Sequence, residues 1–258
     1  MRKSLTLACT LALVSTPALA QMGVNPGEEA AELNQRQYSP YVQRTARNAR
    51  FAEGVYWGDT HLHTSYSTDA GMIGNRLPPE QAYRFAKGEE VITSTGQRAR
   101  LIRPLDFLVV SDHAANLGLA PMIAEANPEL LATEYGKRFY DLVQAGKGYD
   151  AFTLWGTEGI AQNTDLINSP AMTRTVWDRQ IAAAEKHNDP GRFTALIGYE
   201  WTSINTMDYP SNLHRVVVFR DGGDKASQIV PFSTFDSYDP EDLWDFMAGY
   251  EEMTGGRV

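Results

Sequence analysis

The stretch from Tyr56 to Gly71 brings two histidines and two aspartates together within 16 residues. Asp59, His61 and His63 stand two positions apart, so an extended backbone would project their side chains from one face. Neutral imidazole is the commonest metal ligand near pH 7, and a neighbouring carboxylate can hold its second ring N–H. The spacing therefore predicts half of a metal site, with Asp59 supporting a histidine or acting as a ligand. The chain has only five histidines, which strengthens this interpretation.

The rest of the pattern alternates strands and helices. Apolar runs predict strands over residues 55–60, 105–110, 193–198 and 213–219, and residues 88–103 predict a hairpin. Helices are predicted over residues 78–87, 121–125, 128–145, 150–162, 170–187 and 240–253, while residues 64–77 have the composition of a loop. This order predicts a layered or barrel α/β domain over residues 55–258, preceded by an N-terminal arm over residues 21–54.

Further candidate ligands fall at the ends of these strands. Asp112 and His113 follow the second predicted strand, and Glu200 follows the third. The carboxyl ends of parallel strands meet at one rim, so these side chains are expected beside His61 and His63. His214 begins its strand instead of ending it. The loop 202–211 is short enough for an antiparallel return, which would bring His214 to the same rim.

The N-terminus has the features of an export signal. Arg2 and Lys3 open it, a short apolar run follows, and an Ala-x-Ala pattern ends at Ala20. The apolar run is shorter than the roughly 20 residues of a bilayer-spanning helix, and no later segment approaches that length. We therefore expect cleavage after Ala20 and a periplasmic or secreted protein without a transmembrane segment. Cleavage would also remove Cys9, the only cysteine, so the mature chain would form no internal disulfide.

The charge balance restricts the partners. The net charge is −9, and loss of Arg2 and Lys3 without any acidic residue would make it −11. An acidic chain without a basic run argues against nucleic-acid binding. It agrees with a small anionic substrate held by a metal, while nothing in the sequence indicates an oligomeric state.

Taken together, the motifs resemble those of the PHP (polymerase and histidinol phosphatase) superfamily of metal-dependent phosphoesterases. The matching residues are Asp59-Thr60-His61-Leu62-His63, Asp69, Val110-Ser111-Asp112-His113, Gly198-Tyr199-Glu200 and Asn212-Leu213-His214. The residues around these motifs are more specifically similar to DUF3604, a bacterial family of unassigned function. The resemblance covers residues 55–258, and the ordered set is more specific than any single motif.

The resemblance implies a distorted (β/α)7 barrel with two or three divalent ions of Zn, Mn or Fe. By position, His61, His63 and Glu200 would hold one ion and form the catalytic centre. Asp69 and His113 would serve a second ion, Glu200 could bridge, and His214 would complete the bridged pair. Asp59 and Asp112 would support these ligands from outside the coordination shell.

The end of the chain departs from the superfamily pattern. The later motifs, another histidine and an Asp-x-His near the last strand, have no counterpart here, and only Arg257 and Val258 follow Gly256. On this ground the resemblance predicts a barrel that is incomplete at its C-terminus.

Three functional interpretations follow from these residues. The leading one is an exported phosphoesterase that uses metal-activated water, with Arg215 or Arg76 contacting the substrate anion. Another is a different metal-dependent hydrolase, either amidohydrolase-like or acting on sulfate esters. The third is an exported metal-binding protein or an inactive remnant, which the short C-terminus allows.

Overall fold

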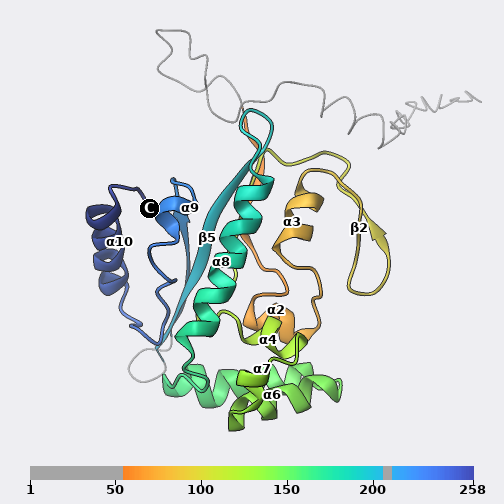
Figure 1. Cartoon of the computed structure of the whole chain (residues 1–258), viewed down its shortest axis with the longest axis vertical. Helices are drawn as coiled ribbons and strands as arrows, with labels where there is room; N and C mark the ends of the chain where they lie inside the picture. Colours follow the sequence, from red (N-terminus) through yellow and green to blue (C-terminus); the bar gives the residue numbers. More distant parts are fainter. Residues whose placement is uncertain (1–54, 206–210) are drawn as a thin grey trace, which may run out of the picture.

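The computed structural model describes residues 55–205 and 211–258, which form a mixed α/β fold around one curled sheet (Figure 1). The four strands lie in the order β1 (Gly58–Leu62), β4 (Phe107–Val110), β5 (Thr194–Asn205) and β6 (Ser211–Phe219). β1, β4 and β5 run parallel, whereas β6 returns antiparallel beside β5. The sheet therefore has the curvature of a half-barrel and one reversal of direction, at its last strand.

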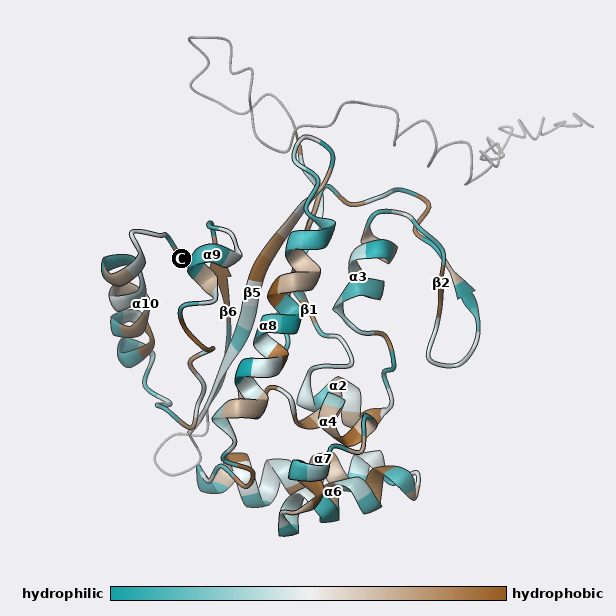
Figure 2. Ribbon diagram, in the orientation of Figure 1, coloured by the Kyte–Doolittle hydropathy of each residue, from teal (hydrophilic) through white to brown (hydrophobic). Residues whose placement is uncertain are grey.

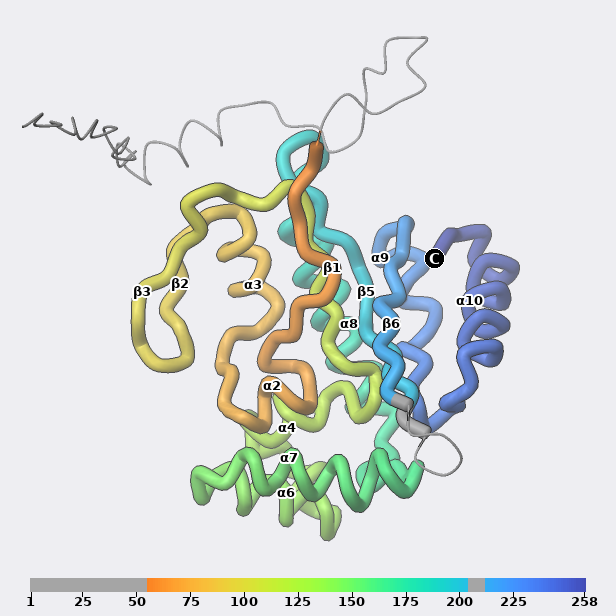
Figure 3. Tube along the Cα trace, turned by 180° about the vertical axis from the view of Figure 1, so that it is seen from behind, coloured from red at the N-terminus to blue at the C-terminus, as the bar shows by residue number. Residues whose placement is uncertain are grey.

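Helices surround this sheet on several sides. α3 (Pro79–Ala86) and α8 (Pro170–His187) pack against each other, and a small hairpin of β2 (Val91–Ile92) and β3 (Arg98–Ala99) lies beyond α3. Seen from behind, α6 (Glu134–Gln144) and α7 (Gly148–Leu154) lie across the end of the molecule toward which β5 runs, and α10 (Pro240–Thr254) stands beside β6 (Figure 3). The remaining bounds are α2 (Thr68–Ile73), α4 (Leu119–Ala124), α5 (Pro128–Leu131), a π-helix (Trp155–Gly159), a 3₁₀ turn (Ile160–Gln162) and α9 (Gly223–Ala226).

Local sequence signals explain where these elements begin and end. α3, α5, α8 and α10 each carry a proline in the first turn, where its missing N–H costs no hydrogen bond. Asn127, Thr133 and Asp239 cap their helices by accepting backbone N–H groups. α10 ends at Gly255, whose φ of 63° is tolerated because glycine has no Cβ.

An aromatic core lies between α8 and the β5–β6 pair. Trp177 of α8 meets Tyr199 of β5 edge-on, with ring centroids 6.0 Å apart, and Phe219 of β6 lies 5.9 Å from Trp177. Tyr250 of α10 packs on Phe219 at 5.0 Å. The first half of β5 and β6 also carry hydrophobic residues along the backbone (Figure 2). Burial of these large side chains fixes α8 and α10 against the sheet.

The structure confirms several predicted elements. The buried parallel strand at 105–110, the hairpin after Gly88, the long helix 170–187 and the antiparallel return of the fourth strand are all present. Within the described residues, no helix is long and apolar enough to cross a membrane. The predicted export signal and the arm over residues 21–54 lie outside the described residues.

Four predictions of elements were wrong in detail. The segment 64–77, predicted as a loop, contains α2, and α9 was not predicted. The predicted helix 128–145 is two helices, because Thr133 caps a new one with its hydroxyl. The predicted helix 150–162 changes to π and then 3₁₀ geometry after Leu154. β5 continues to Asn205 through its pairing with β6, so Glu200 lies inside the strand and not at its end.

Candidate metal centre

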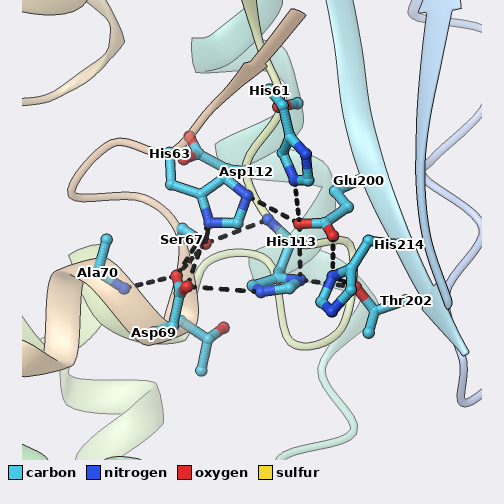
Figure 4. A network of polar contacts seen from close by, with 12 residues as sticks. His61, His63, Ser67, Asp69, Ala70, Asp112, His113, Glu200, Thr202 and His214 are labelled. Atoms are coloured by element: carbon cyan, nitrogen blue, oxygen red, sulfur yellow. Dashed lines mark hydrogen bonds and ion pairs between the residues drawn. The ribbon is translucent and has the colours of Figure 1, made fainter. Parts of the chain in front are cut away.

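Imidazole rings surround the carboxylate of Glu200, which is fully buried (Figure 4). Its Oε2 lies 2.7 Å from Nε2 of His63, 3.2 Å from Nε2 of His61 and 3.2 Å from Nδ1 of His113. Its Oε1 faces Nδ1 of His214. The structure thus brings together, around one acid, four histidines that the sequence spreads over 154 positions.

Backbone pairing places these side chains. Ala114 N–H donates to the carbonyl of Glu200 at 2.8 Å, and Glu200 N–H donates to the carbonyl of Asp112 at 3.1 Å. This single parallel bridge after β4 sets His113 beside Glu200. On the other side of Glu200, the register of β5 and β6 pairs Thr202 directly with His214. Because residues i and i+2 of a strand share a face, Glu200, Thr202 and His214 point the same way.

A second acid joins the cluster from the first turn of α2. Both carboxylate oxygens of Asp69 lie 3.2 Å from Nδ1 of His63, and Oδ2 lies 3.5 Å from Nε2 of His113. α2 can approach because Gly71 has no side chain, and a Cβ there would lie 2.4 Å from the carbonyl oxygen of Ser65. The helix that the sequence analysis missed is therefore the element that delivers Asp69.

Two sets of atoms are close enough to hold ions. The first group is His61, His63 and Glu200, and the second group is His63, Asp69 and His113; within each, the ligand atoms lie within 4.8 Å of one another. The buried atoms His63 Nε2 and Glu200 Oε2 are paired only through ion contacts, 2.7 Å from each other, and burial of such polar atoms is costly unless a partner or a ligand satisfies them. Mixed imidazole and carboxylate donors suit divalent transition metals, so these residues fit a metal centre.

His63 belongs to both groups but cannot serve both in the same way. A neutral imidazole has one nitrogen with a lone pair and one N–H donor. Because the carboxylate of Asp69 accepts hydrogen bonds, it favours the proton on Nδ1 of His63. The lone pair on Nε2 then points toward Glu200 and the first group, which leaves Asp69 and His113 to the second.

Contacts within the cluster strongly shift the pKa values of His63, Asp69 and Glu200. Burial alone would lower the pKa of His63, but hydrogen bonds to Asp69 and Glu200 outweigh it and raise the pKa to about 10. Burial alone would raise the pKa values of both acids. Contacts with His113 and His63 hold the pKa of Asp69 well below its usual range. Contacts with His63 and His113 lower the pKa of Glu200 to about 2. Without an ion, His63 therefore carries a proton and pairs with both ionised acids.

Asp112 supports the loop that carries His63. Its buried carboxylate accepts hydrogen bonds from Thr64 N–H at 2.5 Å and from Thr64 Oγ1 at 2.7 Å. Burial raises the pKa of Asp112 to about 6, although the bonds from Thr64 act in the opposite direction. Asp112 thus ties the segment after β1 to the segment after β4 without touching an imidazole.

Two buried hydroxyl groups, which the sequence analysis did not single out, contact the histidines. Ser67 Oγ lies 3.2 Å from Nδ1 of His63, and Thr202 Oγ1 lies 3.0 Å from Nδ1 of His113 and 3.4 Å from Nδ1 of His214. The pairing of the third and fourth strands could have indicated Thr202, because it stands opposite His214 in an antiparallel register. No rule of sequence spacing would have identified Ser67 as a residue of the site.

The other predicted site residues lie outside the cluster. The carboxylate of Asp59 accepts the backbone N–H of His61 at 2.8 Å and does not hold an imidazole. The guanidinium of Arg76 donates to the carbonyl of Gly71 at 3.1 Å. Arg215 pairs with Trp201 across the sheet, so it leaves the strand on the face opposite Glu200, and it donates to the carbonyl of His214. The structure gives neither arginine a place among the ligands.

One side of the cluster reaches solvent. The side chains of His61 and His214 keep 45% and 37% of their surface exposed, whereas that of Glu200 keeps none. His113 and His63 are largely buried behind them. A small molecule would therefore approach past His61 and His214.

These features define a mixed α/β protein with a candidate centre for divalent metals. The model of the family described as "Protein of unknown function (DUF3604)" matches residues 50–258, so the chain belongs to the DUF3604 family. No curated protein and no solved structure matches the chain.

Proposed function

We propose that this protein is an exported metal-dependent hydrolase that cleaves phosphate esters. The observation that carries the proposal is the convergence of four imidazoles on the buried carboxylate of Glu200, with Asp69 beside two of them. Divalent ions held by such donors supply Lewis acidity, which lowers the pKa of water toward neutrality and offsets charge on a phosphoryl oxygen. We also propose that the curled sheet is part of a PHP-like barrel and that the chain is a member of the PHP superfamily, as the sequence motifs imply.

The residues divide into two binding sets. His61, His63 and Glu200 would hold one ion, and Asp69 and His113 would hold a second. Zinc, manganese and iron all accept this mixture of imidazole and carboxylate. His214 contacts the other oxygen of Glu200 and would orient that carboxylate from the solvent side.

The chain itself contributes orientation and access. Asp69 holds the Nδ1 proton of His63, and Asp112 fixes the backbone of Thr64 directly after it. The buried side of the cluster excludes water, while the exposed edges of His61 and His214 admit a substrate. No serine or cysteine nucleophile is needed, because water is the attacking group.

A second candidate is an amidohydrolase-like reaction at the same centre. It is favoured by the positions of Arg76 and Arg215, which lie away from the ligands and so do not provide a cationic clamp for a phosphate. An amide substrate carries no negative charge, so its binding would not need a cationic clamp.

Activity and metal content separate these functions. The full-length protein, loaded with zinc or manganese, is assayed against phosphomonoesters, phosphodiesters, sulfate esters and amides, with and without a chelator. We expect turnover of a phosphate ester that disappears on chelation and in Glu200→Gln. Turnover of amides or sulfate esters alone would support a different hydrolase, and tight stoichiometric metal without turnover would indicate a binding protein.

A further inference from the structure

The hydroxyl of Ser67 contacts three residues of the second group. Its Oγ lies 2.6 Å from Oδ1 of Asp69 and 3.2 Å from Nδ1 of His63, and it accepts the backbone N–H of His113 at 3.2 Å (Figure 4). Ser67 is fully buried. A single small side chain therefore touches every member of the second group.

These contacts assign each hydrogen-bonding capacity of the hydroxyl. A serine hydroxyl offers one proton and two lone pairs. The carboxylate of Asp69 can only accept, so it receives the proton. One lone pair accepts the N–H of His113, and the other shares the proton on Nδ1 of His63 with the carboxylate of Asp69. This assignment leaves the lone pair of His63 on Nε2, in agreement with the effect of Asp69.

The hydroxyl has no role in capping α2. Ser67 occupies the N-cap position, where a serine usually accepts a backbone N–H from the first turn and adds about 1 kcal/mol of stability. Here the side chain makes no such bond, and Ala70 N–H is instead bonded to Asp69 Oδ1 at 2.5 Å. The hydroxyl is therefore directed at the ligands at the expense of the usual cap.

We infer that Ser67 is a positioning residue that holds Asp69 and His113 in place for the second ion, an inference that rests on the proposed metal centre. Without the hydroxyl, Asp69 loses its shortest side-chain contact and His113 loses the acceptor of its backbone N–H. His63 keeps Asp69 as a partner for Nδ1, so the first group changes little. The two ions should consequently respond unequally to the loss of this one hydroxyl.

Thr68 offers a matched control. It is the next residue, it is also fully buried, and its hydroxyl donates to the carbonyls of Ala115 and Asn116 instead of to ligands. Ser67→Ala and Thr68→Val each delete one buried hydroxyl at the start of α2. A difference between them in metal binding thus reports on the ligands and not on the packing of the helix.

The test is calorimetric titration of the ion-free full-length chain with Zn²⁺, repeated with Co²⁺ while following its visible absorption. We expect two binding events in the unaltered protein and in Thr68→Val. In Ser67→Ala we expect the first event within a few-fold of its original affinity and the second weakened about 10- to 100-fold, the usual effect of removing a ligand's supporting partner.

The outcomes discriminate between the two proposals. Two unaltered events in Ser67→Ala would overturn the role of Ser67 while leaving the metal centre intact. Equal weakening in Thr68→Val, or failure of Ser67→Ala alone to fold, would show that the hydroxyl serves the fold and would also overturn it. Absence of both events from the unaltered protein would instead refute the metal centre on which the inference rests.

Discussion

On one face of β5, Glu200 and Thr202 meet imidazoles, whereas on the other face Tyr199 and Trp201 are buried among aromatic and backbone groups. Tyr199 packs edge-on against Trp177, and Trp201 Nε1 donates to the carbonyl of Ser237 at 3.1 Å. The alternation of a strand places these residues on opposite sides. One strand therefore supplies apolar burial on one side and buried charge on the other, so single substitutions should separate stability from metal binding.

The largest effect is expected on the aromatic face. Trp201→Ala removes a fully buried side chain and should lower the free energy of unfolding by about 3–5 kcal/mol. Metal affinity of the folded fraction should remain close to that of the unaltered protein. Urea unfolding and calorimetry at low temperature measure the two quantities. If metal binding fell as steeply as stability, the two faces would not be independent.

The next effect belongs to the polar face. Glu200→Gln keeps the shape of the side chain but removes the charge that four imidazoles face, so affinity for the first ion should fall at least about 100-fold, or roughly 2.7 kcal/mol. The variant should remain folded by circular dichroism. Retention of full affinity would contradict the assignment of Glu200 as a ligand. Glu185, on α8, is a matched control because its carboxylate instead accepts Gly223 N–H.

Protons should compete with the metal at His63. Because its pKa is raised to about 10 without an ion, and because a ligand imidazole must be neutral, binding should release about one proton at pH 7. Apparent affinity should then rise about tenfold per pH unit below the pKa. Calorimetry in buffers of different ionisation enthalpy counts the proton. The same shift implies that the stability which His63 contributes to the ion-free protein is lost as pH rises from 6.5 through 10.

The variant His63→Gln provides the contrast for this pH dependence. It should abolish the loss of stability between pH 6.5 and 10 that the raised pKa of His63 produces. An unchanged pH profile in the variant would mean that another group is responsible.

The smallest effect is expected at Asp112. Its pKa is raised to about 6, so the folded protein should lose stability as pH rises from 4 through 6 and this carboxyl ionises. Asp112→Asn should remove that loss, about 2 kcal/mol, while keeping an acceptor for Thr64 N–H. Urea unfolding of both proteins at pH 4.5 and 7 measures the change. A difference independent of pH would contradict the raised pKa.

Several features of the fold were accessible from sequence because they depend on local rules. The unbroken apolar run of β4 predicts a buried parallel strand, and the proline at the start of α8 marks its first turn. α2 escaped prediction because the helix has only six residues and lacks a side-chain capping bond. The extension of β5 escaped because it depends on pairing with β6, which is a tertiary contact.

The candidate site was accessible in its acids and histidines but not in its supporting groups. The rule that strand ends converge is enough to gather His113 and Glu200 beside His61 and His63. Ser67 could not be chosen by that rule, because serines are common and its role depends on the approach of α2. Arg215 directly follows His214 in the sequence and therefore lies on the other face of the strand.

The bridge between the segment after β4 and the middle of β5 has a consequence for local opening. Ala114 N–H and Glu200 N–H are both donated to main-chain carbonyls across this bridge, and both residues are buried. Their deuterium uptake should therefore be limited by separation of the two segments, an event that would also move His113 away from Glu200. Deuterium uptake at these two amides thus reports how firmly the backbone holds His113 beside Glu200 in the ion-free protein.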